Sequence, residues 1–159
     1  YGGTINAIHG DGTHIYVGGS TTQTVRRYLK TTLAFVDETA NYGGAINAIH
    51  GDDTHVYAAG ETIQRVRRYL KTTMAFVDET ASYGGTINAI HGDGTHIYVG
   101  GAGTQTVRRY LKTTLAFVDE TIRYGGTLTA IHGDDTPVYV GGSVVQAVWG
   151  DFRTVYFSV

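Results

Sequence analysis

The sequence predicts an all-β chain built from four copies of one four-stranded antiparallel sheet. The tripeptide Tyr-Gly-Gly returns at Tyr1, Tyr42, Tyr83 and Tyr124, which gives a period of 41 residues over three full copies and a shorter fourth. The 159 residues include 23 Gly, 12 Tyr and a single Pro, a profile typical of many tight turns between half-buried strands. Because internal repetition decides an architecture before local propensity does, the repeat governs the rest of the interpretation.

The first half of each copy predicts a hairpin. In the first copy, apolar runs at residues 5–8 and 15–17, within strands predicted at 5–9 and 14–18, flank Asp11-Gly12, a dipeptide that favours a tight turn with positive backbone angles. A turn centred on that dipeptide predicts three cross-strand pairs: His9 with His14, Ala7 with Tyr16, and Ile8 with Ile15.

The second half of each copy predicts another hairpin, with strands over residues 24–30 and 33–38. A turn at Thr31-Thr32 places Tyr28 opposite Phe35 and Arg26 opposite Asp37. These are an aromatic pair and a charge pair, each expected to contribute roughly 0.2–1 kcal/mol.

A sheet of about 40 residues that is apolar on both faces cannot bury itself alone and must stack against its copies. Radial stacking of such sheets makes a β-propeller. The runs Ile15-Tyr16-Val17-Gly18-Gly19 and Val25-Arg26-Arg27-Tyr28 resemble the second and third strands of kelch-like and WD-like propeller blades. The resemblance implies one β-propeller domain over residues 1–159, with four blades at 1–41, 42–82, 83–123 and 124–159. The chain lacks the Trp that kelch blades usually carry near the fourth strand and the Trp-Asp pair of WD repeats, so no subfamily or function follows.

Two ring sizes fit this pattern. The fourth copy offers strands at 127–132, 138–142, 145–149 and 154–159, so all copies begin and end in phase and no strand is left over to complete the first blade. Four blades could close by packing blade one against blade four, as in the hemopexin-like ring that this count resembles. Alternatively, two chains could form one eight-bladed ring. The near-identity of the first and third copies implies recent duplication or deliberate construction.

Composition excludes several classes of function. The chain has no Cys, which removes thiol chemistry and cysteine-ligated metals. Its 12 Lys and Arg nearly balance its 14 Asp and Glu, so no broad field would attract nucleic acid or an anionic membrane. No apolar run approaches the roughly 20 residues that span a bilayer. We therefore expect no nucleic-acid partner, no membrane partner and no cofactor.

Three recurring groups of side chains could carry chemistry. The seven histidines all lie in the first hairpins, and a His9/His14 pair could bind a metal, although no third ligand is evident. Aspartates such as Asp11 recur at the turn; they match no EF-hand spacing and favour turn capping over calcium binding. The Arg26-Arg27 pair could bind single-stranded nucleic acid, but the acidic residues of the next strand favour charge pairing. We predict no catalytic or metal-ligating residue.

Sequence variation marks a candidate binding surface. The first and third copies differ at four positions, all in the loops after the second and fourth strands. Loops on a rigid scaffold often carry function. Alternatively, the loop residues vary because they are not packed and their substitution has no effect on function. The candidate ligand-binding residues are Ser20, Thr21, Asn41, Glu61, Ser82, Ala102, Gly103 and Arg123.

The predicted function is a non-enzymatic binding module that presents loops to a glycan or protein ligand. One alternative is a structural or engineered repeat scaffold without a ligand. Another is an enzyme with a channel site formed by Asn6, Asn47, Asn88 and Thr129, which the near symmetry of these positions disfavours. The outer strands of the fourth copy are almost uncharged, and unpaired edges of that kind invite association. They predict a homodimer contact or a ring seam through Trp149, Tyr156 and Phe157.

Overall fold

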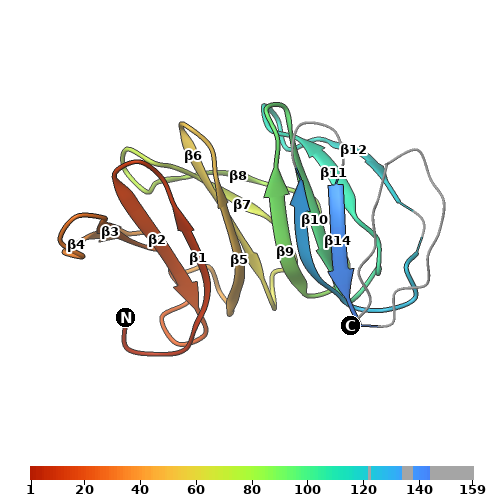
Figure 1. Cartoon of the computed structure of the whole chain (residues 1–159), viewed down its shortest axis with the longest axis horizontal. Helices are drawn as coiled ribbons and strands as arrows, with labels where there is room; N and C mark the ends of the chain where they lie inside the picture. The colour runs from red at the N-terminus through yellow and green to blue at the C-terminus, as the bar shows by residue number, and fades with distance from the viewer. Residues whose placement is uncertain (122, 134–137, 144–159) are drawn as a thin grey trace. The chain divides into compact units, whose positions relative to one another are not determined.

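The computed structural model describes residues 1–121, 123–133 and 138–143 (Figure 1). All regular elements of this part of the chain are β-strands, as the composition predicts. Repeat 1 holds β1 (Ile5–Gly10), β2 (His14–Gly19), β3 (Arg26–Leu29) and β4 (Phe35–Glu38). Repeat 2 holds β5 (Ile46–Gly51), β6 (His55–Gly60), β7 (Arg67–Leu70) and β8 (Phe76–Glu79). Repeat 3 holds β9 (Ile87–Gly92), β10 (His96–Gly101), β11 (Arg108–Leu111) and β12 (Phe117–Glu120), and repeat 4 holds β13 (Leu128–Gly133) and β14 (Val138–Gly142).

Each of the first three repeats forms one four-stranded antiparallel sheet in chain order, β1-β2-β3-β4 and its two copies. This confirms the predicted meander. In repeat 4, β13 pairs with β14, and the strands predicted at 145–149 and 154–159 lie outside the described residues. The chain divides into two compact units, residues 1–79 and 80–159, which we describe separately.

The register predicted for the first hairpin is wrong by one residue on each strand. His9 pairs with Tyr16 instead of His14, and Ile8 pairs with Val17 instead of Ile15. The turn is centred on residues 12–13, because the amide of Asp11 donates to the carbonyl of His14 at 3.0 Å. The positive backbone angle expected at this turn is also absent: among the described glycines, only those at positions 2, 43, 84 and 125 have positive φ.

Half of the register predicted for the second hairpin is right. Tyr28 pairs with Phe35, and their rings meet edge to face with centroids 5.9 Å apart. Arg26, however, pairs with Glu38 instead of Asp37, because a bulge shifts the register between Arg27 and Tyr28. The bulge adds one residue to the outer strand, so every pair beyond it moves by one position.

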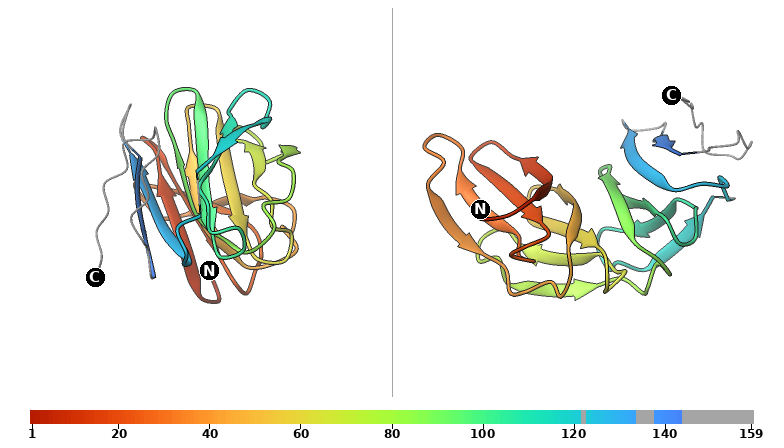
Figure 2. Two further views of the ribbon diagram at one scale, coloured as in Figure 1. Left: turned by 90° about the vertical axis from the view of Figure 1, so that its right-hand side faces the viewer. Right: turned by 90° about the horizontal axis from the view of Figure 1, so that it is seen from below.

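The core of the first unit lies between its two sheets, which stack face to face with β1 beside β5 (Figure 2). Repeat 1 contributes Tyr16 and Val25, and repeat 2 contributes the other buried residues, among them Ile46 and Ile49. A β-carbon at Gly18 would lie 2.6 Å from Cγ2 of Ile46, so glycine is required where the sheets approach most closely. The complete cluster is Tyr16, Val25, Tyr42, Ile46, Ile49, Val56, Ala58, Tyr69 and Met74.

The second unit contains an equivalent core between repeats 3 and 4. Gly100 occupies the position of Gly18, and a β-carbon there would lie 2.9 Å from Cδ1 of Ile131 and 3.1 Å from Cδ1 of Leu128. The cluster is Ala89, Tyr98, Val107, Tyr124, Leu128, Ile131, Val138 and Val140. The same contact between successive repeats therefore forms once in each unit, which confirms that a sheet buries itself against its neighbour.

Candidate functional site

Each sheet has a turn end and a loop end. In repeat 1 the turn end carries residues 11–13 and 30–34, and the amide of Lys30 joins the two turns by donating to the carbonyl of Thr13 at 2.9 Å. The loop end carries residues 20–25 and 39–45, which are joined by the amide of Tyr42 donating to the carbonyl of Gln23 at 2.7 Å. Backbone hydrogen bonds therefore hold both ends in place, and either end could present side chains on a fixed frame.

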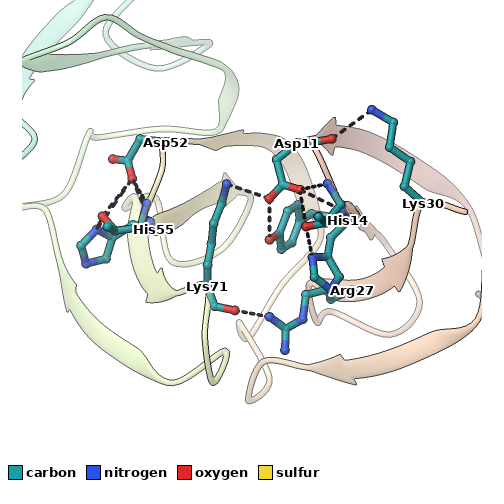
Figure 3. A network of polar contacts seen from close by, with 10 residues as sticks. Asp11, His14, Arg27, Lys30, Asp52, His55 and Lys71 are labelled. Atoms are coloured by element: carbon teal, nitrogen blue, oxygen red, sulfur yellow. Dashed lines mark hydrogen bonds and ion pairs between the residues drawn. The ribbon is translucent and has the colours of Figure 1, made fainter.

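The turn end is built around the carboxylate of Asp11 (Figure 3). Its Oδ1 accepts hydrogen bonds from the amides of Thr13 at 2.8 Å and His14 at 2.7 Å. Its Oδ2 accepts from the hydroxyl of Tyr16 at 3.0 Å and from Nζ of Lys71, in the next repeat, at 2.9 Å. Asp11 therefore caps its own turn, as the sequence predicts, and also holds the neighbouring sheet.

These contacts shift the acid–base behaviour of the pair. Burial alone would raise the pKa of Asp11, but the amides of Thr13 and His14 and the Lys71 ammonium together bring it well below its usual range. Burial, followed by the hydrogen bond to Asp11, raises the pKa of Tyr16 to about 12. Asp11 is thus a fixed anion and Tyr16 a neutral donor at any ordinary pH, which suits a structural contact.

The same capping recurs in repeats 2 and 3. Asp52 accepts from the amides of Thr54 and His55 and from the hydroxyl of Tyr57 at 2.9, 2.8 and 2.7 Å. Asp93 accepts from Tyr98 at 2.6 Å, among other donors. Within the described residues no three or more metal-ligating side chains gather in one place. The aspartates are therefore used by their turns, and the calcium interpretation has no geometric support.

The arginine pairs are bound to acidic residues of the outer strand. Arg27 donates to both oxygens of Asp37, from Nε at 2.8 Å and from Nη2 at 2.5 Å, and its Nη1 donates to the carbonyl of Lys71 in the next repeat. Arg26 donates from Nε to Glu38 at 2.7 Å. Repeats 2 and 3 keep both pairings. The charge pairing expected for these residues is therefore confirmed.

Histidines of successive innermost strands lie close together. The ring centroids of His9 and His50 are 5.5 Å apart, and those of His91 and His132 are 5.3 Å apart. His9 rests over Gly51, where a β-carbon would lie 2.7 Å from its Nε2. Burial, and secondly the Lys71 ammonium, lowers the pKa of His9, so the ring is neutral near pH 7. The predicted His9/His14 pairing across the turn is replaced by pairing between repeats.

The asparagines of the predicted channel tie successive repeats. Nδ2 of Asn6 donates to the carbonyl of Ile46 at 3.3 Å and to Oδ1 of Asn47 at 3.2 Å. Nδ2 of Asn88 donates to the carbonyl of Leu128 at 3.1 Å. These amides have a structural use, which weakens the proposal of a catalytic channel.

The candidate ligand-binding residues lie in the loop-end connections. Seven of them are exposed and Ala102 is half-buried. Thr21 lies against Gly3, where a β-carbon would come within 2.1 Å of its Oγ1, and Arg123 donates from Nε to the carbonyl of Thr104 at 3.2 Å. The backbone of these loops is held while most side chains point to solvent. The exposed residues are Ser20, Thr21, Asn41, Glu61, Ser82, Gly103 and Arg123.

Two structural roles escape the sequence interpretation. Lys71 reaches across to Asp11 and closes the turn ends of two repeats. Leu33, Met74 and Leu115 sit at left-handed positions with φ of 56°, 54° and 53°, although no glycine or asparagine marks these positions. The sequence signal for both was recurrence: a lysine returns at positions 30, 71 and 112, and an apolar residue, Leu or Met, returns at positions 33, 74 and 115.

Comparison with known proteins identifies the fold. No protein-family model matches the sequence, and no curated protein matches it. Among solved structures, the computationally designed Ika4 protein matches with a TM-score of 0.82 at 15% identity, over 94% of this chain and 92% of that one. The RRP9 WD40 repeats match with a TM-score of 0.81 at 7% identity, over 89% of this chain and 46% of that one. The chain is a β-propeller repeat protein.

The sheets are therefore propeller blades, and the inner strand of each blade is its first. The computationally designed Ika8 protein also matches, with a TM-score of 0.79 at 15% identity, over 91% of this chain and 44% of that one. The chain spans about half the length of the Ika8 and WD40 chains and nearly all of Ika4. At these identities the likeness shows the fold alone and identifies no subfamily. The described part of the chain contains no helix with the length and apolar character that a membrane crossing requires.

Proposed function

We propose that this propeller is a non-enzymatic interaction module whose loop end contacts a glycan or protein ligand. One observation carries the proposal: blades one and three are identical except at four positions, and all four lie in loop-end connections. A surface that differs from blade to blade on an otherwise uniform frame can make different contacts at each blade.

The contacts of the two ends support this choice. The polar side chains of the turn end are occupied by one another, as the carboxylate of Asp11 with its five donors illustrates. At the loop end, the hydrogen bond between Tyr42 and Gln23 fixes the backbone. The side chains of Thr21 and Asn41 are exposed above it, although Oδ1 of Asn41 also accepts a hydrogen bond from the amide of Gly43 at 2.6 Å. A ligand would therefore meet polar groups on a backbone that loses little freedom on binding, which favours affinity.

Binding arrays of glycans and of proteins, probed with the whole chain, test the proposal. The sharpest variant is the double substitution Ser20→Ala with Thr21→Gly, because it gives blade one the loop residues that blade three already carries at Ala102 and Gly103. We expect at least a tenfold loss of affinity for any ligand found, with an unchanged circular dichroism spectrum. Asp53→Ala, an exposed turn-end change, is the control and should leave affinity unchanged. Equal affinity of the wild type, the double variant and the Asp53→Ala control would contradict the loop-end proposal.

A structural or engineered scaffold is the second candidate. It is favoured by the near-identity of the blades and by the match to a computationally designed protein. It predicts no ligand in either array, together with a folded and assembled chain. A specific ligand whose affinity depends on the loop end would exclude it.

A further inference from the structure

Blade two packs against blade one through one face of its sheet, which we call its rear face. In blade two the rear face carries Ile46, Ile49 and Met74, with exposed fractions of 0%, 9% and 2%. It packs against the forward face of blade one, the side that carries Tyr16 and Gly18. The second unit repeats the arrangement, since the rear face of blade four lies on the forward face of blade three. The described residues of each unit therefore show one example of the same interface.

The rear face of blade one has the same residues but is open. Ile5, Ile8 and Leu33 are equivalent to Ile46, Ile49 and Met74, and their exposed fractions are 46%, 64% and 65%. The surface above Gly10 is open as well: a β-carbon there would meet only the His14 carbonyl, at 3.9 Å. At the equivalent Gly51, the imidazole of the preceding blade fills this space.

Leu33 keeps the backbone conformation of its buried equivalents, held by its own amide donating to the carbonyl of Leu29 at 2.8 Å. Its φ of 56° is a left-handed conformation that costs an L-residue energy and persists where surrounding contacts repay it. Met74 adopts the same conformation and is buried against blade one. In blade one the conformation is kept while the side chain is exposed, and a row of exposed apolar side chains on one face marks an interaction surface.

A complementary open face lies on blade four. Ala130, His132, Tyr139 and Gly141 line a hollow of about 520 Å³. Gly141 is equivalent to Gly18 and Gly100, but a β-carbon there would meet only Cβ of Ala130, at 3.6 Å. The forward face of blade four therefore has the glycine that receives a rear face, without an isoleucine in place.

We infer that the rear face of blade one binds the forward face of blade four of a second copy of this chain, head to tail, so that two chains close one ring. The contact would extend the interface that already forms twice within the chain. It lies on the blade faces, and so it is independent of the loop-end ligand proposed above.

The packing of blades one and two favours a second copy over the chain's own far end. They stay in hydrogen-bond contact out to their third strands, where Arg27 reaches the Lys71 carbonyl. Third strands lie about 10 Å farther from the ring axis than first strands. Over that distance a quarter turn per blade would widen the gap by about 14 Å, and an eighth of a turn by about 8 Å. An arginine can bridge the smaller widening but not the larger, so the packing of blade one on blade two fits an eighth of a turn per blade better than a quarter turn.

Sedimentation equilibrium of the whole chain tests this inference. We expect twice the chain mass of 17.1 kDa. Ile8→Lys should weaken association at least 100-fold while the chain stays folded, because this side chain is 64% exposed within one chain. Val36→Lys is the matched control, because Val36 does not become buried where its blade packs against another. Its equivalents show this: the exposed fractions of Val36, Val77 and Val118 are 39%, 38% and 38%. A wild-type chain at any other mass, or equal association of the two variants, would overturn the inference.

Mixing two variants tests the head-to-tail geometry. Gly141→Val should block the forward face of blade four, as a β-carbon at Gly18 or Gly100 would block its own interface. Each variant alone loses both contacts of the ring. A mixture of the Ile8→Lys and Gly141→Val chains restores one intact contact and should recover dimers at high concentration. A mixture that associates no better than either variant alone would overturn head-to-tail pairing.

Discussion

Replacing Asp11 by alanine should remove roughly 3.5–7 kcal/mol of unfolding free energy. The hydroxyl of Tyr16, a residue that is 1% exposed, would lose its acceptor, at a cost of about 1–3 kcal/mol. The lost hydrogen bond from Lys71, whose side chain is 12% exposed, adds about 1.5–3 kcal/mol because the donor is charged. The two turn amides lie near solvent and can rehydrate, so losing their cap adds about 1 kcal/mol.

Urea unfolding followed by far-ultraviolet circular dichroism at pH 7 measures this loss. Asp53→Ala is the control: Asp53 is an exposed aspartate beside the capping Asp52, so the change should stay within about 0.5 kcal/mol of the wild type. An Asp11→Ala variant as stable as the Asp53→Ala variant would refute the view that the turn-end network stabilises the fold.

A double-mutant cycle separates the part of the loss that belongs to the contact between blades. Asp11→Ala and Lys71→Met, made singly and together, should show a coupling of about 1–2 kcal/mol, because the two charged groups touch directly. Strictly additive losses would show that Asp11 acts on its own turn alone.

Three further predictions concern the turn end of repeat 3, the contact at Gly18 and the arginine pair of repeat 1. The pKa of Asp93 is lowered from 3.8 to about 2, so its contribution to stability is complete above pH 3.8 and is lost as the pH falls toward 2. The pKa of Tyr98 is raised from 10.0 to about 12, so stability also falls as the pH rises from 10 toward 12. The free energy of unfolding, measured against pH, should fall in both ranges. A free energy that does not change with pH in these ranges would contradict the shifts. Gly18→Val should cost about 1–3 kcal/mol in a thermal unfolding experiment, since the new β-carbon would enter the packed isoleucines, and an unchanged midpoint would exclude this close approach. Arg27→Met should cost about 2 kcal/mol and Arg26→Met less than about 1 kcal/mol, because their side chains are 9% and 27% exposed; equal losses in urea unfolding would argue against a special role for Arg27.

The repeat made the architecture predictable. A period of 41 residues with four short apolar runs predicts a four-stranded meander that needs its copies, and β1 to β12 follow that order. The hairpin registers were less predictable, because side-chain capping decided one of them. Asp11 caps the amides of Thr13 and His14, which moves the turn one residue along the chain. The sequence pattern identifies the Asp-Gly dipeptide, but it does not show whether Asp11 lies within the turn or caps it from the preceding position.

Contacts between repeats were the least predictable part of the site. His9 was expected opposite His14, yet it lies beside His50 from the next blade. Lys71 and Asp11 are 60 positions apart in sequence, and nothing local links them. Such pairs depend on how two sheets are stacked, which a single repeat does not encode. The loop-end candidates remain a prediction, because exposure shows that a side chain is accessible and not what it binds.

Tyrosine is frequent in this chain because one residue meets two opposite needs between blades. The body of Tyr16 fills the core, while its hydroxyl reaches Asp11 at the turn end. Tyr42 is also buried, but its hydroxyl donates to the carbonyl of Arg65 at the loop end, at 2.7 Å, and its amide binds Gln23 of the preceding blade. Phenylalanine could supply the same apolar area but would leave polar partners at both rims unsatisfied. Each blade thus uses tyrosines to fill the space against its neighbour and to fix both of its ends, which makes the turns and loops part of the same packed unit as the core.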